Sequence, residues 1–292
     1  MGSVDAFEDG IRSQPAMMRR FRPQEPLRRL RGCAFTGNGD SLAAALVAGA
    51  LSGGEARAAD PDETLAGRPP ARLYCISVSG RTAACVRAAR HAESTAVTAD
   101  PSSPLARACG SVIRIGGPGP VHTAGSATFL ESALACASLV SRFRVPDGAR
   151  LLAAAERDAE GAGITGSLFV LGSGASYPLA MYCAAKFYEV LGDGARYCRT
   201  EQFYHMELFC ARPGDTVLML DGPDGHGEAL RRGGIRVVAP RPPRGAVPGI
   251  IYRAMYSQVL ALREARRRGV RDCYFATSRA KRASDRAIYC KV

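Results

Sequence analysis

The chain has 292 residues, 47% of them hydrophobic, which is enough for one large or two ordinary packed domains. Its apolar runs are short and broken by Gly, Arg or Ser, and its first 14 residues are acidic, so we expect neither a membrane-spanning helix nor a secretory signal. The net charge of +12 comes almost wholly from arginine, and because the arginine clusters lack interleaved aromatic residues, we expect a small anionic ligand rather than nucleic acid.

The N-terminal half begins with a predicted amphipathic helix at 5–21, which Pro15 is expected to interrupt, and a Pro/Arg-rich extended segment at 22–31. Beyond them, short apolar strands alternate with helices, and the stretch 52–70, rich in Gly, Ala, Asp and Pro, is predicted to be a loop. The predicted strands are 33–36, 73–77, 95–98 and 111–115, and the predicted helices are 41–51, 82–92, 103–109 and 124–142.

The C-terminal half repeats this order after a helical connector at 143–166. A Pro/Arg-rich loop at 240–248 precedes the last long helix, and a short helix near 276–286 is predicted within the polar tail. The predicted strands are 167–171, 195–198, 216–220 and 235–239, and the predicted helices are 177–191, 203–210, 226–233 and 250–268. Short apolar strands that alternate with helices are typical of parallel sheets covered on both faces, so an α/β fold is expected.

The ten cysteines are scattered along the chain and form no C-x-x-C pair. Most of them fall inside apolar segments, so we expect small buried side chains in a reducing cytoplasm rather than a disulfide framework. Their spacing also fits no zinc pattern, and we expect no bound metal.

Two stretches of the chain look like copies of one another. The segments Phe35–Ser41 and Val170–Ser176 each join an apolar run to a G-x-G turn, a hydroxyl and an apolar helical run. They start 135 residues apart, which is about one domain length, so we predict two related modules with a glycine turn after each first strand. The predicted division is 1–31 for a helix and extended segment, 32–145 for module one, 146–249 for module two, and 250–292 for a C-terminal helix and tail.

The most informative local pattern is Ser77-Val-Ser-Gly-Arg-Thr82, which follows the apolar strand beginning at Leu73. A strand ends, three hydroxyls gather around a glycine, and a helix begins. Backbone N–H groups at a helix N-terminus bind phosphate and hydroxyls add donors, so the pattern indicates a phosphate site. A simple hydroxyl cap beside a glycine turn would produce the same pattern.

The two glycine turns do not match the nucleotide-binding patterns. Neither is a full G-x-G-x-x-G with an acidic residue after the second strand, and no Lys-Ser/Thr follows the glycines as a Walker motif requires. A nucleotide cofactor is therefore not expected.

The strand–glycine–hydroxyl–helix unit, with S-x-S-G-x-T 40 residues later, resembles the sugar isomerase (SIS) domain family, whose members bind phosphosugars. Thr95–Ala106 looks like the strand and S-x-L-A turn of that family, and Ala124–Phe129 is similar to a segment in the isomerase half of glucosamine-6-phosphate synthase. Phe7–Pro15 and Tyr256–Leu262 resemble the first and last helices of double-domain members. The resemblance implies two doubly wound, flavodoxin-like parallel-sheet modules, each an αβα sandwich.

The resemblance also implies a role for each candidate residue. Glu201 falls where such isomerases place the carboxylate that moves a proton between C1 and C2, and His205 would open the sugar ring or orient that carboxylate. The spacing Glu201-x-x-x-His205-x-Glu207 looks more like the bifunctional phosphoglucose/phosphomannose isomerases than the aminosugar synthase, although solvated helix residues would give the same pattern. The residues expected to hold the sugar phosphate are Gly37, Asn38, Gly39, Ser41, Ser77, Ser79, Gly80 and Thr82.

Several positions depart from the family pattern. Ala127 stands where the synthase-like motif has lysine, and the second module has Asp221–Gly225 in place of a serine motif, which agrees with one phosphate site per pair of modules. Position 2 is Gly2 rather than a nucleophilic cysteine, so glutamine-dependent amination is not expected. The tail of the family often brings a lysine to the sugar, and Lys281 or Lys291 could do so here.

The resemblance therefore predicts a phosphosugar aldose–ketose isomerase for a hexose 6-phosphate such as glucose, mannose or fructose 6-phosphate. It would work as a cytoplasmic homodimer without a cofactor. One alternative is an aminosugar-phosphate isomerase or deaminase, which would share the phosphate site and the base. Another is a non-catalytic, phosphosugar-binding regulatory protein; such modules keep the serine motif and lose the carboxylate, and the intact Glu201 argues against it.

Overall fold

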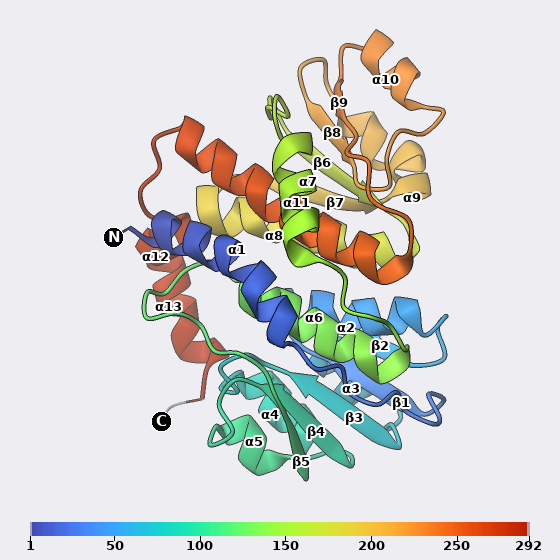
Figure 1. Cartoon of the computed structure of the whole chain (residues 1–292), viewed down its shortest axis with the longest axis vertical. Coiled ribbons are helices and arrows are strands. Elements are labelled where there is room, and N and C mark those ends of the chain that lie inside the picture. The colour runs from blue at the N-terminus through green and yellow to red at the C-terminus, as the bar shows by residue number, and fades with distance from the viewer. Residues whose placement is uncertain (1, 291–292) are drawn as a thin grey trace. The chain divides into compact units, whose positions relative to one another are not determined.

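The computed structural model describes residues 2–290, which divide into two compact units (Figure 1). The five-stranded unit consists of residues 16–146 and 276–290, and the four-stranded unit consists of residues 2–15 and 147–275. Neighbouring strands of each sheet run parallel, and helices flank both sheets. The predicted α/β fold with two flavodoxin-like modules is confirmed.

The sheet of the five-stranded unit has the strand order β2-β1-β3-β4-β5. The direction in which strands are added reverses between β1 and β3, which are hydrogen-bonded neighbours. Doubly wound sheets bind ligands at the carboxyl ends of the strands that flank such a reversal. The strands are β1 (Cys33–Thr36), β2 (Arg57–Ala59), β3 (Arg72–Ile76), β4 (Ser94–Thr98) and β5 (Ser111–Arg114).

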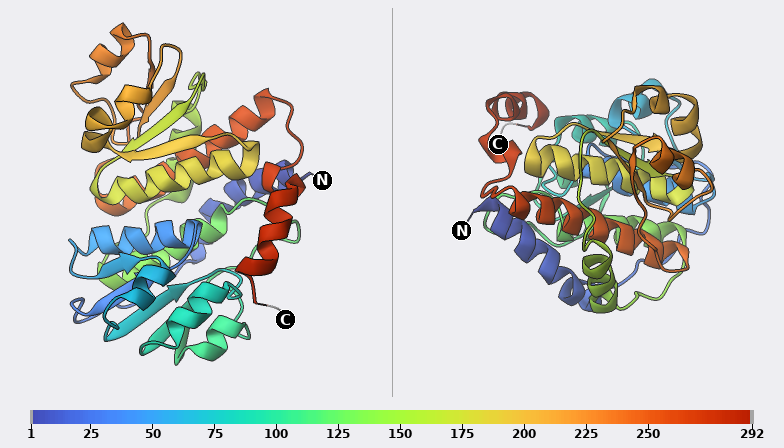
Figure 2. Two further views of the ribbon diagram at one scale, coloured as in Figure 1. Left: turned by 180° about the vertical axis from the view of Figure 1, so that it is seen from behind. Right: turned by 90° about the horizontal axis from the view of Figure 1, so that it is seen from above.

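Helices cover both faces of this sheet (Figure 2). On one face α2 packs against β1 and β2, and α6 packs on α2; on the other face α4 and α5 lie against β3 and β4, and α3 packs on α4. The helices are α2 (Asp40–Leu51), α3 (Pro61–Ala66), α4 (Ala83–Ala89), α5 (Pro104–Ala108) and α6 (Ala127–Val140). Burial of Leu73, Cys75, Cys85 and Leu105 in one apolar cluster fixes α4 and α5 on the sheet.

The four-stranded unit repeats this architecture with the strand order β7-β6-β8-β9. Here α8 packs on β6 and β7 and contacts α11, which also contacts α7, while Phe203 of α9 and Leu230 of α10 complete the apolar cluster on the other face. The strands are β6 (Leu168–Gly172), β7 (Ala195–Arg199), β8 (Thr216–Met219) and β9 (Arg236–Val238). The helices are α7 (Gly148–Asp158), α8 (Tyr177–Leu191), α9 (Thr200–His205), α10 (Gly227–Arg232) and α11 (Ala246–Arg267).

The two glycine turns have the same backbone shape. A Cβ atom added to Gly37 would lie 2.6 Å from the backbone carbon of Ser41, and one added to Gly172 would lie 2.6 Å from the backbone oxygen of Ser176. The second glycines of the two turns, Gly39 and Gly174, have φ angles of 55° and 51°. The internal repeat in the sequence therefore corresponds to a repeat in three dimensions.

The largest difference from the predicted elements lies in 52–70. This stretch contains the short strand β2 and the helix α3 rather than only a loop. Strand β2 has three residues and no β-branched or aromatic side chain, so it carries no strand pattern. The helix did have a signal, because Asp60 caps it by accepting a hydrogen bond from the N–H of Glu63 over 2.8 Å, and Pro61 occupies its first turn.

The first helix, α1 (Ser3–Arg20), continues through Pro15. The expected interruption is absent among the described residues, since the apolar side chains on both sides of the proline are buried and this packing outweighs one lost backbone hydrogen bond. The predicted helix at 203–210 is instead α9 followed by a 3-10 turn, Glu207–Cys210, and the tail forms two helices, α12 (Tyr274–Thr277) and α13 (Arg279–Ile288).

None of the ten cysteines, all of which lie within the described residues, forms a disulfide bond, and seven of them are buried. Buried thiols behave as small apolar side chains, in agreement with the sequence-based expectation. Within residues 2–290, no helix combines the length and apolarity needed to cross a bilayer.

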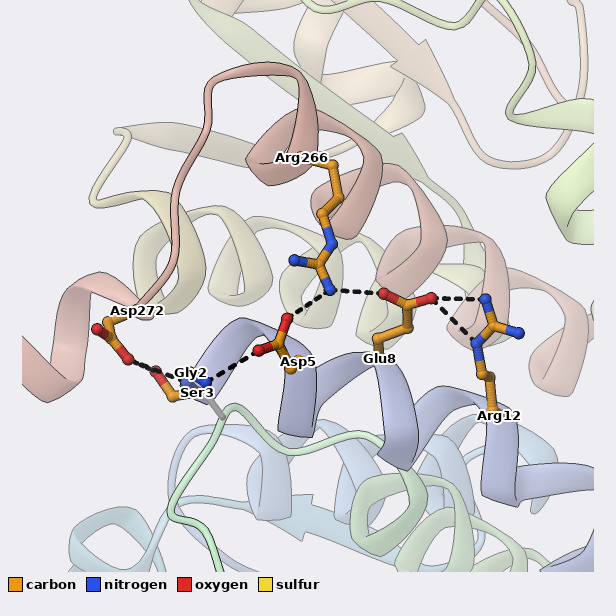
Figure 3. A network of polar contacts seen from close by, with 7 residues as sticks. All are labelled: Gly2, Ser3, Asp5, Glu8, Arg12, Arg266 and Asp272. Atoms are coloured by element: carbon orange, nitrogen blue, oxygen red, sulfur yellow. Dashed lines mark hydrogen bonds and ion pairs between the residues drawn. The ribbon is translucent and has the colours of Figure 1, made fainter.

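A polar network ties the start of α1 to the end of α11 inside the four-stranded unit (Figure 3). Arg266 donates to Asp5 Oδ1 over 2.8 Å and to Glu8 Oε2 over 2.7 Å, and Arg12 donates to Glu8 Oε1 over 2.6 Å. The hydrogen bonds from Arg266 lower the pKa of both Asp5 and Glu8 below their ordinary values. Next to them, the N–H of Ser3 donates to Asp272 Oδ1 over 2.9 Å.

Replacing Arg266 by alanine should lower the melting temperature by about 2 °C at pH 7, because exposed ion pairs contribute little individually. Because the pKa of each carboxyl is lower in the folded than in the unfolded chain, the network stabilises the fold at pH values above the ordinary pKa values of 3.8 and 4.5. This stabilisation is lost as the pH falls through the lower pKa values of the folded state. The difference between wild type and R266A should thus be constant above about pH 5 and shrink below it. Thermal melts from pH 7 to 3 test this, and a difference that grows on acidification would refute it.

Candidate functional site

Two loops follow neighbouring strands at the carboxyl edge of the five-stranded sheet. The glycine turn 37–41 follows β1, the serine motif 77–82 follows β3, and Thr36 of β1 pairs with Cys75 of β3. The strand order reverses between these two strands, which is where doubly wound sheets bind ligands. The structure therefore brings the two halves of the predicted phosphate site to one edge.

The serine motif forms a tight turn that leads into α4. The N–H of Gly80 donates to the carbonyl of Ser77 over 2.9 Å, and Gly80 has a φ of 60°. The hydroxyl of Ser77 lies 3.1 Å from the hydroxyl of Thr82, so these two groups hydrogen-bond across the turn. Thr82 occupies the N-cap position of α4 but makes no side-chain capping bond, so this hydroxyl does not act as a simple helix cap.

The three hydroxyls of the motif differ in their access to solvent. Ser77 is 3% exposed, Thr82 is half-buried, and Ser79 is exposed. The backbone N–H of Arg81 donates to Ser79 Oγ over 3.3 Å, which holds that side chain at the turn. Ser79 and Thr82 can therefore contact a ligand directly, whereas the buried Ser77 holds Thr82 in place through the hydrogen bond between their hydroxyls.

The glycine turn after β1 adds exposed polar groups. Asn38 and Gly39 are exposed, and Ser41 is half-buried at the start of α2. The thiol of Cys85, on α4, lies 3.4 Å from Asn38 Oδ1, which links this turn to the helix that follows the serine motif. Burial raises the pKa of Cys85 to about 12, so the group remains a neutral thiol that can donate to Asn38.

Three residues that support the serine motif were not predicted. The hydroxyl of Thr98 donates to the carbonyl of Val78 over 3.1 Å, and the N–H of Leu105 donates to the carbonyl of Gly80 over 2.9 Å. Ser103 caps α5 and lies so close to Gly80 that a Cβ atom there would be 2.0 Å from its Oγ. The signal was available, because Ser103 begins the S-x-L-A turn noted in the sequence.

The C-terminal tail of the five-stranded unit reaches the serine motif. Tyr289 forms an antiparallel bridge with Thr82, and the N–H of Cys290 donates to the carbonyl of Arg81 over 2.8 Å. Lys281, on α13, is ion-paired with Asp285, and its ammonium lies 5.7 Å from the centre of the Tyr289 ring. The tail thus places the ammonium of Lys281 near the ring of Tyr289, the residue that bridges to Thr82.

The other tail lysine considered from the sequence, Lys291, lies outside the described residues. The structure assigns it no position relative to the serine motif.

Glu201 and His205 belong to the four-stranded unit, where α9 follows β7 at the carboxyl edge of the sheet. Nε2 of His205 lies 3.2 Å from Oε1 of Glu201, one helical turn away. The side chains of Glu201 and His205 are 79% and 66% exposed, so the pair is accessible to a ligand from solvent. The structure therefore brings the predicted base and its histidine together.

A second carboxylate follows this pair in the sequence. Glu207 begins the 3-10 turn after α9, and its Oε2 is buried. Burial and the neighbouring Glu207 raise the pKa of the Cys198 thiol to about 12. The pattern Glu-x-x-x-His-x-Glu contained this residue, but the sequence did not indicate that its side chain turns inward.

Tyr204 adds another contact that the sequence did not indicate. Its hydroxyl donates to Asp224 Oδ2 over 2.7 Å, and its ring lies 4.2 Å from the ring of His226. Burial, followed by the bond to Asp224, raises the pKa of Tyr204 above its ordinary value. Across residues 2–290, no group of three or more His, Cys, Asp or Glu side chains could hold a metal ion.

Neither the known protein-family models nor the curated proteins match the chain. Comparison by structure gives many matches. A glucosamine-6-phosphate deaminase from Thermotoga maritima superposes with a TM-score of 0.73 at 15% identity, covering 92% of this chain and 95% of that one. The chain therefore shares its fold with this deaminase.

Two further solved structures share this fold. The C-terminal domain of glucosamine-fructose-6-phosphate aminotransferase from Francisella tularensis has a TM-score of 0.73 at 15% identity, covering 90% of this chain and 96% of that one. A tagatose-6-phosphate ketose/aldose isomerase from Escherichia coli has a TM-score of 0.72 at 17% identity, covering 92% and 95%. The family resemblance noted in the sequence is thus confirmed at the level of the fold, over nearly the whole chain.

Proposed function

We propose that the chain binds the phosphate of a phosphorylated sugar between the serine motif and the glycine turn of the five-stranded unit. The observation that carries this proposal is the position of the serine motif at the reversal of strand order, with Ser79 exposed and Thr82 bonded to Ser77. The backbone N–H groups of such a turn, together with hydroxyl donors, are suited to phosphate oxygens. The half-buried Arg81 beside them adds positive charge.

We propose further that the reaction is aldose–ketose isomerisation of a hexose 6-phosphate. Glu201 would take the proton from C2 of the open-chain aldose to leave an enediolate and would return it to C1, while the hydroxyl proton of O2 passes to O1; this gives the ketose without net loss of atoms or electrons. His205, bonded to Glu201, would orient the carboxylate or move the proton needed for ring opening. The isomerase among the structural neighbours, which acts on tagatose 6-phosphate, supports this class of reaction.

A second candidate reaction is deamination or amination of an aminosugar phosphate. It is favoured by two structural neighbours, a glucosamine-6-phosphate deaminase and the C-terminal domain of a glucosamine-fructose-6-phosphate aminotransferase. Both reactions need a phosphate site and a base at C1 and C2. Ammonia release from glucosamine 6-phosphate would identify the deaminase, and ketose formation without ammonia would identify the isomerase.

The replacement Glu201→Gln is expected to lower turnover by about 100- to 10,000-fold while leaving sugar-phosphate binding within a few-fold of wild type. The amide keeps the size of the side chain but cannot accept the C2 proton. Coupled assays of fructose 6-phosphate formation and thermal shift with the same ligand would measure the two effects. Glu207→Gln is the matched control, because it removes the neighbouring carboxylate and should retain turnover.

Turnover that is lost in E207Q and kept in E201Q would overturn the assignment of Glu201 as the base. A wild-type chain that binds sugar phosphates and never converts them would overturn the enzymatic proposal in favour of a phosphosugar sensor.

We propose a cytoplasmic homodimer as the working form. Cysteines without disulfide bonds suit a reducing compartment, and two-fold dimers are the commonest assemblies.

A further inference from the structure

The glycine turn of the four-stranded unit is filled by a side chain of the protein itself. Oδ2 of Asp221 accepts a hydrogen bond from the backbone N–H of Ser173 over 2.9 Å and another from the hydroxyl of Ser176 over 2.7 Å. The same two groups also bond within the turn, the N–H to Ser176 Oγ and the hydroxyl to the carbonyl of Ser173, each over 2.7 Å. Ser173 and Ser176 lie just before the first turn of α8, a helix of 15 residues. A carboxylate oxygen therefore occupies the place where a phosphate oxygen would lie in an anion-binding turn.

The register of the two sheets shows which residue corresponds to Asp221 in the other unit. Cys75 of β3 and Met219 of β8 each pair with the residue that directly precedes the first glycine of the neighbouring turn. Two positions beyond them lie Ser77 and Asp221. The equivalent position therefore carries a hydroxyl in the five-stranded unit and a carboxylate in the four-stranded unit.

The second oxygen of Asp221 is also engaged. Nη2 of Arg253, on α11, lies 2.9 Å from Asp221 Oδ1, and Nε of Arg253 donates to the carbonyl of Leu220 over 2.9 Å. The arginine side chain is only 15% exposed, so its position is fixed by the packing of α11. The turn thus offers a backbone N–H, a hydroxyl and a guanidinium to the two oxygens of one anion.

We propose that Asp221 is a built-in anion that occupies the second glycine turn and keeps phosphate out of it. Removal of the carboxylate would leave Ser173 N–H, the Ser176 hydroxyl and Arg253 around an open site for a phosphate monoanion or dianion. This inference concerns the four-stranded unit and does not depend on the proposed function of the serine motif. It distinguishes the second glycine turn, which a carboxylate of the chain itself occupies, from the first turn of the same backbone shape.

The variant Asp221→Ser, which introduces the residue type found at the equivalent Ser77, tests the proposal. Calorimetric titration with inorganic phosphate should show one more site per chain in D221S than in wild type, whatever the number in wild type. The double variant D221S/R253Q should lose this additional site. Phosphate at about ten times its dissociation constant should raise the melting temperature of D221S by roughly 3 °C more than that of wild type.

Asp215→Ala is the matched control. Asp215, which unlike Asp221 is buried, accepts two backbone N–H bonds, from Ser167 over 2.7 Å and from Arg212 over 2.8 Å, but among the described residues no arginine side chain pairs with it. Phosphate should therefore not restore the stability of D215A.

No additional phosphate site in folded D221S, or an additional site that persists in D221S/R253Q, would overturn the proposal. Should D221S not fold in chloride, its refolding on addition of phosphate would support the proposal. If D221S folds in neither salt, the isosteric variant Asp221→Asn is tested instead. A neutral amide would leave Arg253 without an anionic partner, so phosphate should raise the melting temperature of D221N more than that of wild type. Equal phosphate effects on D221N and wild type would then refute the built-in anion. Absence of phosphosugar binding by the serine motif would leave all these outcomes unchanged.

Discussion

Replacing Ser79 and Thr82 together by alanine is expected to weaken sugar-phosphate binding about 100-fold. Each replacement removes a hydroxyl that would donate a charge-assisted hydrogen bond to the phosphate. Ser79 is the exposed hydroxyl of the serine motif, and Thr82 makes no capping bond that the helix would miss. The fold should therefore survive the change. Isothermal titration with fructose 6-phosphate or glucosamine 6-phosphate measures the loss.

Ser173→Ala provides the matched control for that experiment. Ser173 is an exposed serine in the corresponding turn of the other unit, where Asp221 takes the backbone N–H that Ser173 retains as alanine. Its replacement should leave the affinity for a sugar phosphate unchanged. Equal losses in both variants, or full affinity in the double alanine variant, would remove the serine motif from the binding site.

Gly80→Ala should destabilise the chain by about 2–5 kcal/mol, the largest single-residue effect expected here. Gly80 has a φ of 60°, which costs any other residue about 1–2 kcal/mol. In addition, the new Cβ atom would lie 2.0 Å from Ser103 Oγ and 2.9 Å from Thr98 Oγ1, so the turn must move. Urea denaturation measures the free energy of unfolding, and sugar-phosphate binding should fall with it.

Gly39→Ala separates strain from crowding. Gly39 has a φ of 55°, and an added Cβ atom would meet nothing within 4 Å, so only the backbone term of about 1–2 kcal/mol applies. Removing the Ser103 side chain in G80A/S103G should recover part of the loss of G80A, because the closest contact disappears. A G80A variant no less stable than G39A would show that the packing of the serine motif against α5 is unimportant.

The repeated architecture could be predicted from the sequence because it depends on local patterns. The strand 33–36 and the helix 177–191 were predicted with the bounds that the structure gives, since an apolar run, a glycine turn and an apolar helical run each have a clear periodicity. The missed strand β2 has only three residues and owes its place to pairing with β1. Pairing between strands is a long-range property that a short segment does not encode.

The candidate site was predictable in part for the same reason. The clustering of Ser77, Ser79 and Thr82 at a sheet edge follows from their positions after a strand, although their differing exposure does not. The bridge between Thr82 and Tyr289 joins residues more than 200 positions apart, and no local pattern indicates it. Likewise, Glu207 shares a motif with Glu201, and only the 3-10 turn that follows α9 carries its Oε2 out of solvent.

The matching backbones of the two glycine turns bear on how duplicated modules diverge. A copy that stops binding its ligand leaves N–H donors exposed at a helix start, and selection for folding alone would then erode the turn. Under the proposed role of Asp221, a carboxylate in the loop after the third strand keeps those donors satisfied, so the glycines would persist without any selection for ligand. In proteins descended from such duplications, glycine spacing would then record ancestry, and the loop after the third strand would show whether a turn is filled or open.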